Sequence, residues 1–155
     1  MSFRNDELAG VVDLFGALTR AELERALAEL AFKAGEDVDE RAVDDAVASA
    51  VESYHLVAVD RGDETLLAPG PVAFPTLPAD AEDLPHILDV EPREIDRASV
   101  ATDVETRLRA DAARAVDDGD HDRIERLLDV TYDLETWAPV DVSEVRTRLD
   151  DALDD

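Results

Sequence analysis

Three segments with helical periodicity, followed by two short extended segments, limit the fold of this chain more than any other feature of its sequence. In each helical segment, apolar residues recur every three or four positions and therefore fall on one face of a helix. We predict three amphipathic helices, the first from Asp6 to about Ala17 and the third from Glu40 to Tyr54. Their apolar faces are Leu8, Val11, Val12 and Phe15; Leu23, Leu27, Leu30 and Ala34; and Val43, Val47, Val51 and Tyr54.

The boundaries of these helices carry residues that are typical of helix caps. Thr19 and Glu22 have the spacing of a capping box, in which a hydroxyl and a carboxylate accept hydrogen bonds from otherwise unpaired amides. Gly35 suits the C-terminal end of the second helix, and Asp39 suits the N-terminal end of the third. We therefore expect short connections between the three helices.

The two extended segments, residues 56–59 and 65–68, surround a polar stretch that contains Gly62. Apolar runs on both sides of a glycine-containing turn predict a β-hairpin. Three helices followed by a hairpin resemble a winged helix-turn-helix in element order, over residues 6–74. The resemblance implies that the helix Glu40–Tyr54 takes the place of a recognition helix and that the hairpin is the wing.

A group of prolines interrupts the chain after the hairpin and excludes a long helix or a central strand there. The segment from Leu84 to Leu88 is too apolar to remain in solvent, so we expect it to pack on the folded part. We predict a winged-helix-like domain over residues 1–74, a connector packed on the fold over residues 75–92, and a helical region over residues 93–155. The prolines are Pro69, Pro71, Pro75, Pro78 and Pro85.

Helical periodicity returns in the C-terminal region, where Gly119 is a stop signal and Asp141 a start signal. Asp141 and Glu144 have capping-box spacing, with aspartate in place of serine or threonine. We therefore predict a mainly α fold with one small β-hairpin: a winged-helix-like N-terminal half and a C-terminal helical half. The three C-terminal stripes are Val100, Val104, Leu108 and Ala112; Ile124, Leu127, Leu128 and Thr131; and Val142, Val145, Leu149 and Ala152.

The charge balance is unusual, because forty acidic residues stand against fourteen arginines and a single lysine, Lys33. The formal net charge is −25, and such a surface suits a protein that stays soluble in molar salt. The chain has no cysteine, no apolar stretch that could span a membrane, and no secretory signal at its N-terminus. We expect a halophilic protein in the cytoplasm that binds no membrane.

The sequence also resembles small acidic haloarchaeal proteins of an uncharacterised family. The resemblance spans nearly the whole chain, and residues 8–16 (LAGVVDLFG) and 84–92 (LPHILDVEP) carry it most clearly. It implies a haloarchaeal source, and it implies no activity, ligand or functional residue.

The charge pattern opposes DNA binding through the expected recognition helix. Affinity for DNA depends on arginine and lysine side chains that neutralise phosphates. The outward positions of this helix instead hold four carboxylates and one arginine, and the expected wing adds Asp60, Asp63 and Glu64 against Arg61. We therefore favour protein contact, or a purely structural role for this helix, over DNA binding. The outward positions are Glu40, Arg41, Asp44, Asp45, Ala48, Ser49, Glu52 and His55.

Five arginines and the only tryptophan are candidate binding residues. The arginines form either an anion or partner patch or a self-paired helix surface, and acids four residues before three of them favour the second interpretation. Trp137 is either a partner anchor or a residue that closes the core between two helices, and we favour the second. The arginines are Arg107, Arg109, Arg114, Arg123 and Arg126.

Motifs of catalysis and of metal or nucleotide binding are missing from the sequence. His55, His86 and His121 lie far apart and form no local metal pair, and residues 118–123 lack the glycine that a calcium loop needs at its sixth position. We predict no enzymatic activity, no catalytic or metal-binding residue and no cofactor. The sequence favours a protein–protein interaction module with an unidentified protein partner; the alternative is a winged-helix transcriptional regulator that binds DNA.

Overall fold

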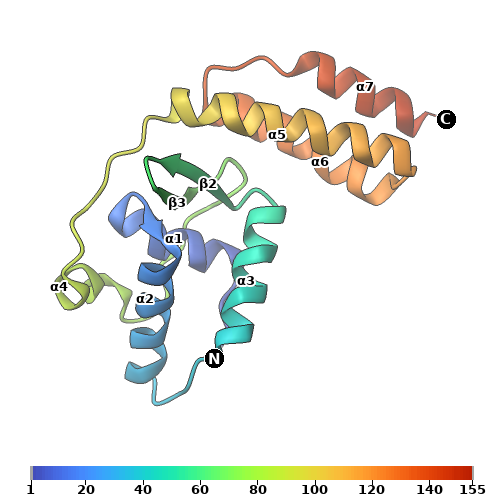
Figure 1. Cartoon of the computed structure of the whole chain (residues 1–155). Coiled ribbons are helices and arrows are strands. Elements are labelled where there is room, and N and C mark those ends of the chain that lie inside the picture. Colours follow the sequence, from blue (N-terminus) through green and yellow to red (C-terminus); the bar gives the residue numbers. More distant parts are fainter. Residues whose placement is uncertain (1, 155) are drawn as a thin grey trace. The chain divides into compact units, whose positions relative to one another are not determined.

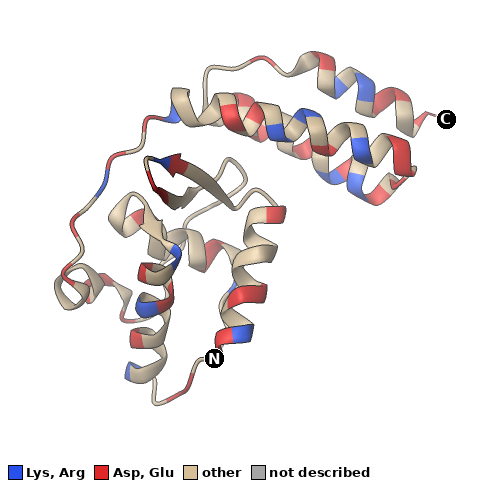
Figure 2. Ribbon diagram, in the orientation of Figure 1, with Lys and Arg blue, Asp and Glu red and all other residues tan. Residues whose placement is uncertain are grey.

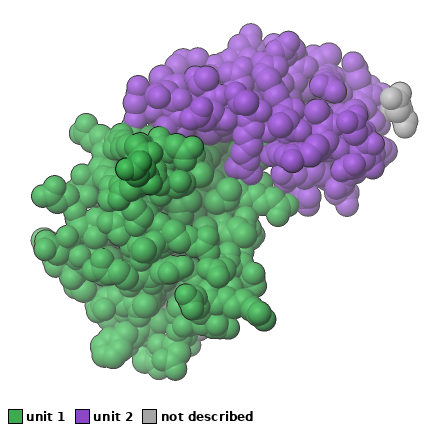
Figure 3. Space-filling view, viewed as in Figure 1, with its two compact units in different colours: residues 1–95 green, residues 96–155 purple. Residues whose placement is uncertain are grey.

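The computed structural model describes residues 2–154 and divides the chain into two compact units (Figures 1 and 3). The first unit comprises residues 1–95 and the second residues 96–155. The first contains helices and a small antiparallel sheet, and the second contains only helices. The predicted class, mainly α with a small β element, is confirmed. The segment expected to act as a connector, residues 75–92, falls inside the first unit.

The first unit begins with the three helices that the apolar periodicity predicts. Helix α1 spans Asn5–Phe15, α2 spans Arg20–Lys33 and α3 spans Glu40–Glu52. The stripes that define these helices provide most of one continuous core. Fully buried members include Leu8, Val11, Val12, Phe15, Leu23 and Leu27.

The predicted helix caps of α2 and α3 are confirmed. The Thr19 side chain accepts the amide proton of Glu22 at 3.2 Å, and the Glu22 carboxylate accepts that of Thr19 at 2.8 Å. Gly35 follows the end of α2 with a φ of 73°, a left-handed conformation that glycine adopts without strain. Asp39 accepts the amide proton of Arg41 at 3.1 Å and caps α3.

The expected C-terminal limit of the third helix, Tyr54, is wrong, because α3 ends at Glu52. Tyr54 has a φ of 65°, and the amide of His55 donates to the carbonyl of Ala50 at 2.9 Å. This bond closes the helix and turns the chain into the sheet. The Tyr54 side chain is fully buried, so packing of its ring holds a bulky residue in a conformation that glycine usually takes.

The predicted hairpin is confirmed and belongs to a three-stranded sheet of order β1–β3–β2. Strands β2 (Leu56–Arg61) and β3 (Glu64–Pro69) pair in antiparallel register, with Arg61 opposite Glu64. Strand β1 (Leu18–Thr19) pairs with β3 and was not expected, since two residues show no periodicity. The order α1, β1, α2, α3, β2, β3 is compatible with a winged helix-turn-helix.

The proline-rich segment packs on this unit, as its apolar residues predict. After an irregular stretch it forms the short 3-10 helix η1 (Ala81–Asp83) and α4 (Leu84–Leu88), and Ala81, Leu84 and Leu88 join the core. Its irregular part is held on α1 by Asp6. The Asp6 side chain accepts the amide proton of Phe74 at 3.1 Å, and its carbonyl accepts that of Thr76 at 3.0 Å.

The last part of the first unit is tied back to the α1–α2 connection by Arg93. Its guanidinium donates to the carbonyl of Ala17 at 3.1 Å and to the Glu22 carboxylate at 2.8 Å. Burial raises the pKa of Glu22, but the hydrogen bonds from Arg93 and Thr19 outweigh burial and hold that pKa below its usual value. Glu22 therefore joins the cap of α2 to residue 93.

The second unit consists of α5 (Arg97–Asp118), α6 (His121–Trp137) and α7 (Ser143–Leu153). The three predicted stripes supply its buried face, including Val104, Leu108, Ile124, Leu127, Val145 and Leu149. Gly119 ends α5 with a φ of 64°, and Asp120 caps α6.

The predicted capping box at Asp141 and Glu144 is wrong. Helix α7 begins at Ser143, so Val142 occupies the cap position, where it makes no side-chain hydrogen bond. Val142 is fully buried, and its amide donates to the Glu135 carboxylate of α6 at 2.9 Å. Burial of Val142 thus decides where this helix starts, and Asp141 instead accepts the amide proton of Ser143 at 2.9 Å.

Candidate functional site

The outward face of α3 and the tip of the hairpin are exposed and acidic, and Figure 2 marks the aspartates and glutamates of α3 in red. Over residues 39–45 the chain carries four carboxylates and one guanidinium. Asp44 is paired with Arg20 of α2. At the hairpin tip, residues 60–64 are all exposed, with three acids against Arg61. The two elements that a winged helix uses to contact DNA therefore both present mainly carboxylates.

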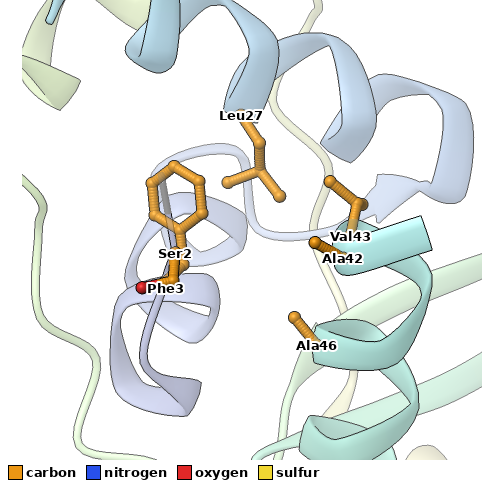
Figure 4. Close-up of a pocket in the computed structure, with 6 residues that line it drawn as sticks. All are labelled: Ser2, Phe3, Leu27, Ala42, Val43 and Ala46. Atoms are coloured by element: carbon orange, nitrogen blue, oxygen red, sulfur yellow. The ribbon is translucent and has the colours of Figure 1, made fainter. Parts of the chain in front are cut away.

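An apolar recess opens beside this acidic face, between the N-terminal segment, α2 and α3 (Figure 4). Phe3 and Leu27 lie across from the side chains that α3 contributes. Ala42 and Ala46 are one helical turn apart, and their small side chains leave a space of about 70 Å³ open at the surface. The lining residues are Ser2, Phe3, Leu27, Ala42, Val43 and Ala46.

Three of the five candidate arginines converge on one carboxylate of the second unit, that of Asp111, which is only 8% exposed. Arg107 approaches it at 3.4 Å and Arg123 at 3.6 Å, and Arg114 pairs with its other oxygen. Arg107 pairs with Asp111, the acid four residues after it, whereas the spacing predicts the acid four residues before it. These arginines neutralise a poorly exposed carboxylate and join α5 to α6.

The remaining two candidate arginines lie elsewhere on the second unit. Arg109 pairs with Glu105, as the spacing predicts, and with Glu144 of α7. Hydrogen bonds to these two carboxylates raise the pKa of Arg109. It also borders a recess of about 190 Å³ between α5 and α7. Arg126 is exposed on α6 and borders neither this recess nor the Asp111 cluster.

Trp137 is half-buried at the end of α6, where the Arg97 guanidinium lies 5.5 Å from its ring centroid. This cation–π contact joins the last residue of α6 to the first residue of α5. Tyr132 is exposed, and Arg146 of α7 lies over its ring at 4.1 Å. Both rings thus take part in contacts among the helices of the second unit.

Ser53, His55 and Asp6 form a cluster that sequence reasoning missed, because Asp6 is far from the other two in sequence. The Ser53 hydroxyl lies 2.7 Å from Nδ1 of His55, and Nε2 of His55 lies 3.7 Å from the Asp6 carboxylate. The geometry is that of a helix cap, since the Ser53 hydroxyl also lies 2.8 Å from the Ser49 carbonyl, which accepts its proton. The Asp6 carboxylate also accepts the amide proton of Phe74, the residue just before the connector.

The other histidines, His86 and His121, are exposed, on α4 and at the start of α6. Within residues 2–154, no group of three or more histidine, aspartate or glutamate side chains is placed to hold a metal ion. In the same range, no helix combines the length and apolarity needed to cross a membrane.

Exposed apolar side chains in the first unit lie mainly on the proline-rich segment. Phe74 is 80% exposed, although its backbone is held by Asp6, and Leu77 and Ile87 are partly exposed. Phe32, near the end of α2, is 78% exposed. Sequence patterns predict an apolar connector, but they give no sign of the recess at Ala42, because two alanines at four-residue spacing do not by themselves indicate a recess.

Comparison with known proteins supplies a family and no further relatives. A model of a family of unknown function, DUF7109, matches residues 6–154, nearly the whole of the described chain. No curated protein and no solved structure matches the chain. The matched range covers both compact units, and the chain therefore belongs to this family of unknown function, DUF7109.

Proposed function

We propose that this chain is a non-enzymatic protein-binding module whose first unit contacts a partner through α3 and the neighbouring apolar recess. One observation carries the proposal: an apolar recess lies open beside the exposed acids of α3. In a winged helix, this is the surface that would face DNA. Binding of a partner over an exposed apolar recess is favourable, because it removes apolar surface from water. The acidic rim repels phosphate and so disfavours nucleic acid.

The proposed environment is the cytoplasm of a haloarchaeon. The net charge of −25 supports it, because a dense carboxylate surface keeps a protein soluble in molar KCl. At such salt the Debye length is about 3 Å, so charges act mainly on groups in direct contact. Apolar contact is then the main source of affinity.

Two alanines on α3 provide a matched test. Ala42 and Ala48 are both exposed on the same helix, but only Ala42 lines the recess. The wild type, Ala42→Arg and Ala48→Arg are each used to capture partners from a haloarchaeal lysate in molar KCl, with and without nuclease. We expect a nuclease-resistant protein that the wild type and Ala48→Arg retain and Ala42→Arg loses. Equal capture by both variants contradicts the proposed surface.

The alternative function, a transcriptional regulator, is supported by the element order of the first unit. It requires affinity for duplex DNA despite the exposed acids of α3 and of the hairpin tip. Recovery of DNA that nuclease removes favours this alternative over the protein-binding module.

A further inference from the structure

The shape of the recess limits what can enter it. Its volume of about 70 Å³ is several times the roughly 10–15 Å³ that one water needs, which leaves room for the end of one aliphatic side chain. Phe3, Leu27 and Val43 supply apolar walls, and Val43 is almost fully buried. Ser2 supplies the one polar side chain of the lining. An apolar group therefore fits this space better than a polar one.

The charges around the recess limit what can lie over its mouth. Asp45 is three residues after Ala42 on α3, which makes it a neighbour of Ala42 on the helix surface. Asp39, which caps α3, lies three residues before Ala42. Both are exposed, as is Glu40. Residues 39–45 carry four acids against Arg41, and Arg20 of α2 pairs with Asp44, so the rim of α3 keeps a net negative charge. A segment that covers Ala42 must approach these carboxylates closely.

Two occupants conflict with this charge pattern. A nucleic acid would bring phosphates against the rim. A second copy of the chain, placed with α3 against α3, would bring the same acids together, and like charges in contact oppose association even when salt screens those further apart. A basic segment of a different protein has the complementary charge.

We infer that the recess receives one aliphatic side chain from a basic segment of a partner protein, with lysines or arginines on either side that contact Asp39 and Asp45. The inference rests on the proposed function and adds the chemistry of the partner. In molar KCl the aliphatic side chain supplies most of the affinity, and the cations select the segment through direct contacts. Affinity should therefore depend strongly on the apolar residue and more weakly on salt.

The test uses a short amidated peptide with one central leucine between pairs of arginines. Its affinity for the full chain is measured by calorimetry in molar KCl, beside a peptide with alanine for leucine and one with glutamates for arginines. We expect the leucine-to-alanine change to weaken binding about tenfold or more, since burial of one leucine accounts for that much. We also expect Ala42→Arg to weaken binding, and Ala48→Arg to leave it unchanged.

Amide chemical-shift mapping with the wild type guards against a misfolded variant. Shifts confined to residues 2–3, 27 and 39–46 support the inference. Equal affinity of the leucine and alanine peptides, or shifts elsewhere, overturn it. If the peptide fails to bind while Ala42→Arg still loses its natural partner, the proposed surface stands and the basic-segment inference is wrong. If Ala42→Arg keeps its natural partner, the proposed function fails as well.

Discussion

Gly10→Ala should destabilise the first unit, although glycine-to-alanine changes inside helices usually stabilise. Gly10 lies in α1 under the connector, and a Cβ there would sit 2.1 Å from the carbonyl oxygen of Thr76 and 2.5 Å from its carbonyl carbon. Both atoms belong to the backbone, so no rotamer change relieves the contact. The connector must move away from α1.

The magnitude follows from three contributions. Alanine gains about 1 kcal/mol of helix propensity over glycine. Displacing the connector breaks the hydrogen bonds from the amides of Phe74 and Thr76 to Asp6, at about 1 kcal/mol each, and overpacking costs a further 1–3 kcal/mol or so. The sum is a loss of roughly 2–4 kcal/mol in the free energy of unfolding of this unit.

Urea unfolding at constant molar KCl, followed by circular dichroism, measures this change. Gly119→Ala is the control, because no atom lies within 4 Å of a Cβ added at Gly119. Gly119 has a φ of 64°, so this substitution should cost only about 1–2 kcal/mol of backbone strain. Trp137 is the only tryptophan and lies in the second unit, so its fluorescence reports that unit. A Gly10→Ala variant as stable as the wild type would refute the placement of the connector on α1.

Three further predictions concern ion pairs and salt. Glu22→Gln should destabilise the first unit by about 1–3 kcal/mol, since it removes a charged acceptor of Arg93. Because folding holds the pKa of Glu22 below its usual 4.5, the wild type keeps this advantage above pH 4.5 and loses it as the pH falls through the lowered pKa. The free energies of unfolding of the two proteins, measured by urea titration, should therefore converge only in more acidic solution. Arg146→Gln should lower the melting temperature of the second unit, followed by Trp137 fluorescence, because Arg146 pairs with Glu135; an unchanged temperature contradicts the role of this pair. Lowering KCl from molar to tens of millimolar should expand or unfold the chain through carboxylate repulsion, and unchanged circular dichroism across that range contradicts it.

The helices and the hairpin were predictable because local sequence decides them. The apolar stripes of α1, α2 and α3 repeat at helical spacing, and Thr19 and Glu22 satisfy each other's amides without help from distant residues. Strand β1 was not predictable in this way, since it exists only through its pairing with β3. The start of α7 is likewise decided by the burial of Val142 and by the hydrogen bond from its amide to Glu135 of α6.

The candidate site was predictable only in its charge. The acids of α3 are visible in the sequence, and their exposure follows from the helical stripe that faces the core. The recess depends on where Phe3 and Leu27 come to lie against α3, and no spacing in the sequence gives that distance. The convergence of arginines on Asp111 is similar, because it needs both α5 and α6.

The most direct test of the protein-binding surface is photocrosslinking from α3 in molar KCl. A photoreactive side chain is placed at position 42, which lines the recess, or at position 48, which is exposed on the same helix but lies outside it. The account predicts a protein adduct from position 42 that nuclease leaves intact, and no adduct from position 48. Nucleic-acid adducts from position 42, or the same protein adduct from both positions, would contradict it.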